Sequence, residues 1–226
     1  LPVDQAVTFR PSRILYMRPL TSKGQHSEIL DLTTHLKTTF REDITPEIHQ
    51  LAQLTLRANP IFHPTWVVRG SSRFVTSRLS VEEPTTEGSQ STSRAMALAE
   101  IRKHLLNFGT VHIRFPADSA HSSHGISVEP VSHRSRAQSF VKDSVPYLWD
   151  TLSTTTASPA SSDTTFWGKP MALSGRLRLF KAVAGKKFEA ARYESSNGKF
   201  ALGGLLVLEE REVDPLIAAV TLIGVL

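Results

Sequence analysis

Four histidines in the middle of the chain are the side chains best suited to metal chemistry: His112, His121, His124 and His133. Imidazole nitrogens bind transition metals, and the chain has no cysteine that could add a thiolate ligand. His121 and His124 stand in a serine-rich stretch with no carboxylate at a useful spacing. We therefore interpret this stretch as a solvated loop and expect neither a metal nor another cofactor.

The sequence also lacks the motifs of nucleophilic and phosphoryl-transfer catalysis. No serine occupies a Gly-X-Ser-X-Gly elbow, and no P-loop occurs. The acidic pairs Glu82-Glu83 and Glu209-Glu210 border expected loops or strand ends, where carboxylates are normally solvated. These observations favour a binding protein over an enzyme.

Basic residues are concentrated in one segment. Residues 168–199 contain eight lysines and arginines against two glutamates, so this segment carries +6 in a chain of net charge +5. Such a concentration attracts anionic lipid headgroups or nucleic acid. The candidate ligand-binding residues are Arg176, Arg178, Lys181, Lys186, Lys187 and Arg192.

Two interpretations of this basic segment stay open. In the first, the protein is a non-enzymatic module that contacts anionic phospholipid or a membrane surface. In the alternative, the charges only solvate a protein–protein interaction or structural domain with no lipid ligand. Nucleic acid is disfavoured because only Phe180, Phe188 and Tyr193 are available for base stacking.

The elements that carry the basic residues form an expected three-stranded meander. Residues 176–179 alternate arginine and leucine, which places both arginines on one face of a strand. Ala184-Gly185 predicts a turn into a second strand at 187–193, with Lys186 and Lys187 close enough to the arginines to share one phosphate. Asn197-Gly198 predicts a type I′ hairpin turn. The third strand, 200–208, is apolar on both faces, so we expect it to be covered on both sides.

A helix is expected to follow. Asp214 is a good N-cap and Pro215 a good first helical residue, and residues 216–226 carry no charge. A helix that is apolar all round is buried in protein or in a membrane. Eleven residues rise only about 16 Å, whereas a bilayer core needs about 20 residues. Burial within the sheet is the preferred interpretation, and a truncated transmembrane segment is the alternative.

The first 60 residues are expected to be partly helical. Ser27 is the expected N-cap of a helix with an apolar face from Ile29 to Phe40, and Thr45-Pro46 opens a second helix. From Trp66 the pattern favours strands instead. The runs 65–69 and 73–77 flank Gly70-Ser71-Ser72, which predicts a turn.

Farther along, residues 94–108 fit a helix or a strand, whereas Val111, Ile113 and Phe115 alternate as in a strand. The polar stretches near 84–93 and 151–165 predict mobile loops.

Composition agrees with a folded chain. Of 226 residues, 40% are hydrophobic and 21% charged, as in ordinary globular proteins. The absence of cysteine favours an intracellular location, cytoplasmic or membrane-peripheral, although a leader removed before Leu1 leaves secretion open. We predict a mainly β fold of the α+β class. A barrel or strongly curved antiparallel sheet over 61–226 surrounds a buried C-terminal helix, and 1–60 forms a partly helical extension.

Several short motifs add a resemblance to this prediction. The motifs are Tyr147-Leu148-Trp149 or Phe166-Trp167-Gly168, then Leu177 and Leu179, Ala191-Arg192-Tyr193, Gly204-Leu205-Leu206-Val207 and Asp214-Pro215-Leu216-Ile217. Over residues 62–226 the chain resembles the tubby-like group, which includes tubby C-terminal domains, LURP-one-related proteins and phospholipid scramblases. Its nearest likeness is to an uncharacterised fungal branch of that group.

The resemblance implies a barrel of about twelve strands around a hydrophobic helix, and it does not imply an enzyme. Tubby domains bind phosphoinositides through basic residues. No residue of this chain matches those ligands position by position, so none is carried over.

Overall fold

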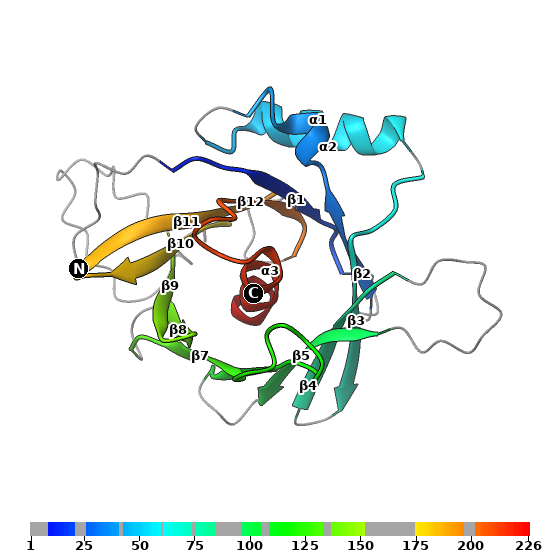
Figure 1. Cartoon of the computed structure of the whole chain (residues 1–226). Coiled ribbons are helices and arrows are strands. Elements are labelled where there is room, and N and C mark those ends of the chain that lie inside the picture. Colours follow the sequence, from blue (N-terminus) through cyan, green and yellow to red (C-terminus); the bar gives the residue numbers. More distant parts are fainter. Residues whose placement is uncertain are drawn as a thin grey trace, which may run out of the picture.

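The computed structural model describes the chain in ten stretches (Figure 1). They are residues 9–20, 26–40, 43–59, 61–73, 76–84, 96–104, 109–132, 137–151, 175–196 and 202–226. The predicted loops near 84–93 and 151–165 and the turn at Asn197-Gly198 lie wholly or largely outside these stretches.

The described residues form twelve strands that close into one antiparallel barrel. Each strand pairs with its neighbours in the chain, and β1 closes the ring by pairing with β12. The strands are β1 (Arg13–Met17), β2 (His26–Asp31), β3 (Trp66–Arg73), β4 (Thr76–Glu82), β5 (Ala97–His104), β6 (Val111–Arg114), β7 (Ile126–Pro130), β8 (Gln138–Lys142), β9 (Val145–Thr151), β10 (Arg176–Val183), β11 (Lys186–Ser195) and β12 (Gly204–Leu208).

Helix α3 (Pro215–Val225) lies among the inward-facing side chains of the barrel (Figure 1). Asp214 caps it as predicted, because its carboxylate accepts hydrogen bonds from the backbone N–H groups of Leu216 and Ile217. Every residue from Leu216 to Val225 is buried. Two residues link the helix to the wall, since the Nε1 of buried Trp149 on β9 donates to Thr221 Oγ1 at 3.1 Å.

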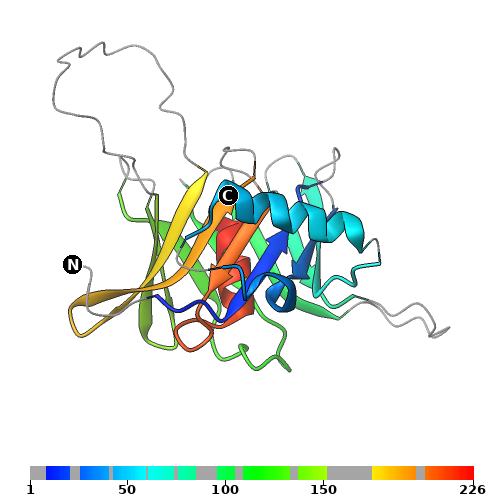
Figure 2. The same cartoon turned by 90° about the horizontal axis from the view of Figure 1, so that it is seen from above.

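Strand β12 is buried on both faces, as its doubly apolar sequence predicts. Leu206 and Leu208 face the inner core around α3. Leu205 and Val207 belong to a second core on the outside of the barrel. That outer core is covered by α1 (Thr33–Leu36) and α2 (Pro46–Ala58), which lie across β1 and β12 (Figure 2).

A glycine at the start of β12 allows its close approach to β11. A Cβ on Gly204 would lie 2.1 Å from the backbone oxygen of Glu194, which is less than any real contact. The pair Ser195↔Gly204 therefore depends on the missing side chain.

The helix predicted from Ser27 is wrong. Residues 26–31 form strand β2, which pairs with β1 and β3, and only Thr33–Leu36 are helical. The Ser27 hydroxyl does not cap a helix and donates instead to the Arg18 carbonyl oxygen at 2.5 Å. A short apolar run fits the period of a helix and that of a strand equally well. Backbone pairing with a neighbouring strand on each side makes this run a strand. The barrel therefore begins at β1, well before residue 60.

The turn predicted at Gly70-Ser71-Ser72 is also wrong, because β3 continues through these residues to Arg73. Residues 97–104, which fitted either element, are strand β5. The helix capped by Thr45, the strand at Val111 and the meander strands β10 and β11 are confirmed. Ala184 and Gly185 form the turn between β10 and β11, both with positive φ.

We expect an aspartate at Ile217 to unfold the protein. The Ile217 side chain is buried in α3, where an unpaired carboxylate has no access to water and the lost apolar burial costs roughly 1.5–3 kcal/mol. Val141→Asp on β8 is the matched control, because Val141 is 57% exposed. Circular dichroism of both variants tests the prediction, and a soluble Ile217→Asp variant with a native spectrum would contradict it.

Candidate functional site

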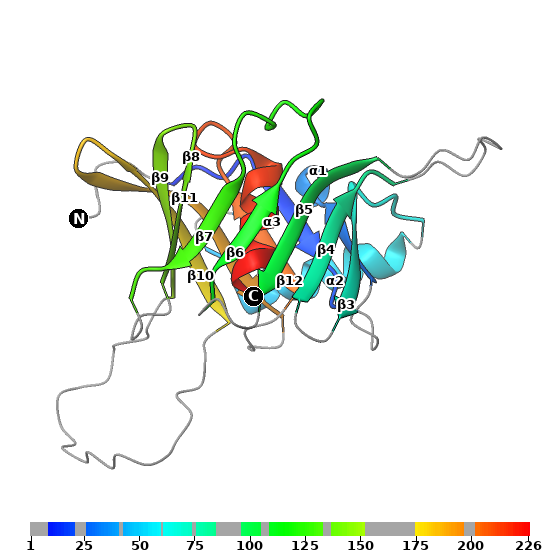
Figure 3. The ribbon, with the colours of Figure 1, turned by 90° about the horizontal axis from the view of Figure 1, so that it is seen from below.

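The predicted basic site lies on the hairpin of β10 and β11, which extends beyond the barrel wall (Figures 1 and 3). The pairing of β10 with β9 ends at Lys181↔Tyr147, and that of β11 with β12 ends at Ala191↔Leu208. The two strands of the hairpin continue to pair with each other as far as Val183↔Lys186. On the β11 side the extension is therefore about five residues, or roughly 17 Å, long.

A β-bulge marks the point where the hairpin leaves the barrel. The register shifts between Leu179↔Ala191 and Phe180↔Glu189, so Ala190 has no residue opposite it. Such a bulge bends the strands and increases their twist, which turns the outer end of the hairpin away from the wall.

Three of the six predicted residues, Arg176, Arg178 and Arg192, lie on the outside of the barrel wall. Each is paired with a carboxylate. Arg176 bonds Glu194 at 2.9 Å, Arg178 lies 3.4 Å from Glu189, and Arg192 makes a 3.0 Å bond to Glu189 through Nη2. These arginines therefore contribute little uncompensated charge.

Asp43, from the segment before α2, joins this network 3.3 Å from Arg192. Burial would lower the pKa of Arg192, but Glu189 and Asp43 outweigh it and hold that pKa above its usual value. Burial raises the pKa of Glu194, against the opposing effect of Arg176. The network thus ties the outer helical layer to the barrel.

The three lysines, Lys181, Lys186 and Lys187, lie at the outer end of the hairpin. Lys181 forms a 3.2 Å ion pair with Glu212, and the Lys187 ammonium lies 5.7 Å from the ring centre of Phe180. Beside them at the turn, Val183 is 44% exposed.

The structure does not bring all six residues together. Arg176 stands opposite Glu194 at one end of the hairpin, whereas Lys186 stands opposite Val183 at the other. Seven residues of strand separate the two ends, or about 23 Å. The expectation that Arg176, Arg178, Lys186 and Lys187 converge on one phosphate is therefore wrong.

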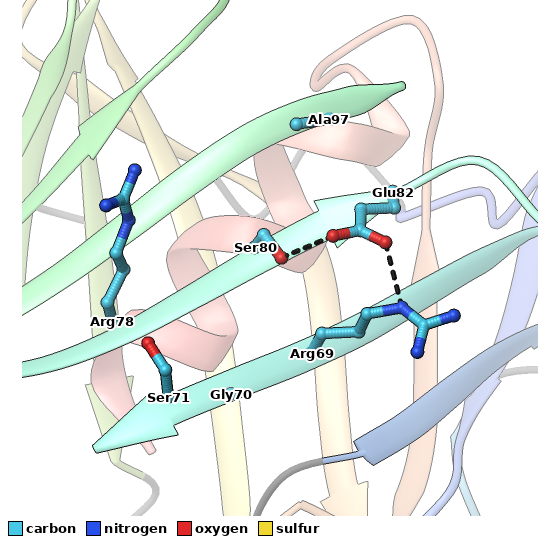
Figure 4. Close-up of a pocket in the computed structure, with 7 residues that line it drawn as sticks. All are labelled: Arg69, Gly70, Ser71, Arg78, Ser80, Glu82 and Ala97. Carbon is cyan, nitrogen blue, oxygen red and sulfur yellow. Dashed lines mark hydrogen bonds and ion pairs between the residues drawn. The ribbon is translucent and has the colours of Figure 1, made fainter. Parts of the chain in front are cut away.

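A groove on the opposite side of the barrel escaped the sequence analysis. It has a volume of about 450 Å³ and lies on the outer face of β3, β4 and β5 (Figure 4). Its lining residues are Arg69, Gly70, Ser71, Arg78, Ser80, Glu82 and Ala97. The turn predicted at 70–72 would interrupt β3, so these residues were not expected on one strand face. The sequence pattern that marks the groove is an arginine followed two residues later by a serine, at Arg69 and Ser71 and again at Arg78 and Ser80.

The histidines singled out for metal chemistry have other neighbours where the structure describes them. His112 contacts the Ser127 hydroxyl, His121 lies 3.5 Å from Asp214, and His133 is outside the described residues. Within the described stretches, no three histidine, aspartate or glutamate side chains come together as metal ligands. In the same stretches, no helix is long and apolar enough to cross a bilayer.

Comparisons with known proteins add no relative: no protein family, no curated protein and no solved structure matches the chain.

One buried histidine outside the predicted site has an unusual environment. His49 of α2 is only 9% exposed, and its Nδ1 lies 3.3 Å from the Ser196 hydroxyl. Its Nε2 is buried and has no hydrogen-bond partner among the described residues. Burial, and then the positive charge of Arg176, lower the pKa of His49.

We expect His49 to make the protein less stable in acid. Because its folded-state pKa is lowered, the unfolded chain binds the proton more readily, so stability falls as the pH drops below about 6.5. Replacing His49 by glutamine should flatten this pH dependence, as measured by urea unfolding at pH 7.5 and 5.5. His63→Gln, at an exposed histidine, is the control and should leave the slope unchanged. Equal slopes in all three proteins would contradict the assignment.

Proposed function

We propose that this protein is a non-enzymatic binding module that contacts anionic membrane surfaces through the outer end of the β10–β11 hairpin. The observation that carries the proposal is the extension of this hairpin beyond both neighbouring strands, with Lys181, Lys186 and Lys187 around the exposed Val183. A projecting end can reach a flat surface that the barrel wall cannot.

The three arginines on the barrel wall are poorly suited to bind an anionic surface, because carboxylates neutralise them. Arg176, Arg178 and Arg192 share Glu194, Glu189 and Asp43, so three cations face three carboxylates. At the outer end, Lys181 forms an ion pair with Glu212, which comes from outside the hairpin.

The physics of the surface favours lysines in this position. Near an anionic leaflet each basic residue contributes about 1 kcal/mol, and the attraction fades beyond a Debye length of about 8 Å at physiological salt. Only basic residues that come close to the leaflet therefore contribute to the attraction. Long lysine side chains keep the ammonium among the headgroups while small apolar residues such as Val183 and Ala184 lie against them.

The tubby-like resemblance is part of this proposal. It is supported by the closed ring of twelve strands and by the capped apolar helix among their inner side chains. The proposed contact gives the protein a membrane-peripheral location on a leaflet rich in anionic lipid.

We expect vesicles that contain phosphatidylserine to retain the protein at low salt, and neutral phosphatidylcholine vesicles not to. Lys186→Gln/Lys187→Gln should weaken retention roughly thirtyfold, because two lysines at about 1 kcal/mol each are removed. Co-sedimentation across salt concentrations measures both effects.

Lys37→Gln/Arg57→Gln is the charge-matched control, because Lys37, directly after α1, and Arg57, on α2, are both exposed. This variant should be retained like the parent protein. No retention at low salt, or equal loss in both double variants, would reject the lipid contact and leave the protein-interaction domain as the surviving function.

A further inference from the structure

The groove on β3–β5 owes its depth to small residues on an uncovered part of the barrel. Figure 3, which looks onto β3–β7, shows none of the described helices outside these strands. Gly70, Ser71, Ser80 and Ala97 line the groove between longer side chains. The hollow of about 450 Å³ falls within the range of small-molecule sites, roughly 300–1,000 Å³.

Two arginines and two serines form a square on the outer face of this groove. Arg69 stands opposite Ser80, and Ser71 stands opposite Arg78. The arginines are therefore diagonal neighbours, about 7–8 Å apart at the backbone and within reach of each other's side chains. In Figure 4 their guanidiniums lie toward opposite ends of the groove, with Ser80 between them and Ser71 beside the base of the Arg78 side chain.

Each arginine is drawn outward by a carboxylate beyond the square. Arg69 Nε bonds Glu82 at 2.9 Å, and the other oxygen of Glu82 accepts from the Ser80 hydroxyl at 2.7 Å. Arg78 pairs with Glu100, which also binds Arg102. Arg78 and Arg102 stand directly opposite each other on β4 and β5, so this one carboxylate separates two like charges.

The cluster has a surplus of positive charge and of donors. Three guanidiniums share two carboxylates, Glu82 and Glu100. Burial would raise the pKa of Glu100, but Arg102 and Arg78 hold it below its usual value, so Glu100 is ionised at neutral pH. Arg69 uses only Nε on Glu82, and both arginines are more than half exposed, with side-chain values of 54% and 57%. Both arginines therefore keep N–H groups that contact neither Glu82 nor Glu100, and among the described residues these groups border the groove.

We propose that this groove binds a phosphate monoester of a polar small molecule, with its phosphoryl group between Arg69 and Arg78. A tetrahedral phosphoryl group has three oxygens that can accept from two arginines and a serine hydroxyl at once. A planar carboxylate is best satisfied by one guanidinium fork, and Glu82 and Glu100 already fill that role. The remaining polar volume suits a hydroxyl-rich body such as a sugar. Among the described residues, no aromatic side chain lines the groove, which argues against a nucleobase.

Isothermal titration calorimetry with three matched sugars tests the proposal on the full chain. Glucose 6-phosphate should bind, glucuronate should bind at least about tenfold more weakly, and glucose should not bind, because each lost charge-assisted hydrogen bond is worth about 1.5–3 kcal/mol. Inorganic phosphate should compete with glucose 6-phosphate. Glucuronate binding as tightly as glucose 6-phosphate would overturn the assignment to phosphate.

Variants locate the binding. Arg69→Gln/Arg78→Gln should weaken glucose 6-phosphate binding by about a hundredfold, since charge-assisted bonds from two arginines are lost. Lys37→Gln/Arg57→Gln removes the same charge elsewhere and should bind normally, as should Lys186→Gln/Lys187→Gln of the hairpin. Thermal unfolding checks that the groove variant is folded. A folded groove variant that binds like the parent would overturn the proposal.

A lipid could present the same chemical group, so vesicles distinguish the source. Phosphatidic acid carries a phosphate monoester, whereas phosphatidylserine carries a diester. Retention on phosphatidic acid that needs Arg69 and Arg78, without binding of glucose 6-phosphate, would assign the groove to a lipid headgroup with the same phosphate chemistry. If neither glucose 6-phosphate nor phosphatidic acid depends on these arginines, the groove is not a phosphate site. The hairpin proposal is unaffected by either result.

Discussion

Enclosure of one apolar helix is the constraint on which the rest of this structure depends. A barrel of twelve strands is too wide for its own inward side chains to fill, whereas α3 has no polar face to offer to water. The helix fills the inside of the barrel, and the barrel shields the helix from water. The bond from Trp149 to Thr221 and the cap at Asp214 satisfy the polar groups that this arrangement buries or leaves at a helix end.

Because the helix occupies the inside of the barrel, binding is expected on the outside. The outer surface is not uniform. The helices α1 and α2 cover β1 and β12 with a second apolar core, and the β10–β11 hairpin extends beyond the wall. None of the helices that the structure describes lies over the face of β3–β5. The two proposed sites lie in the two regions without such a cover.

Local pairing, more than total charge, distinguishes these regions. The basic segment carries +6 in the sequence, yet Asp43 and Glu212 reach it from distant parts of the chain and neutralise part of it. Conversely, residues 66–104 attract no notice by charge, but strand pairing places Arg78 against Arg102 and leaves them one carboxylate, Glu100. A charge becomes available for binding only where the fold gives it no equal partner.

Elements with local signals can be predicted from the sequence alone. The cap at Asp214, the alternation of β10, the turn at Ala184-Gly185 and the doubly apolar β12 all follow from neighbouring residues. Residues 26–31, in contrast, are a strand because of long-range pairing. Their short apolar run fits a helix equally well until β1 and β3 pair with it. The groove on β3–β5 is a second case, since Glu100 meets Arg78 only when β5 pairs with β4. The lysines of the β10–β11 hairpin, in contrast, follow from the local sequence around Ala184-Gly185.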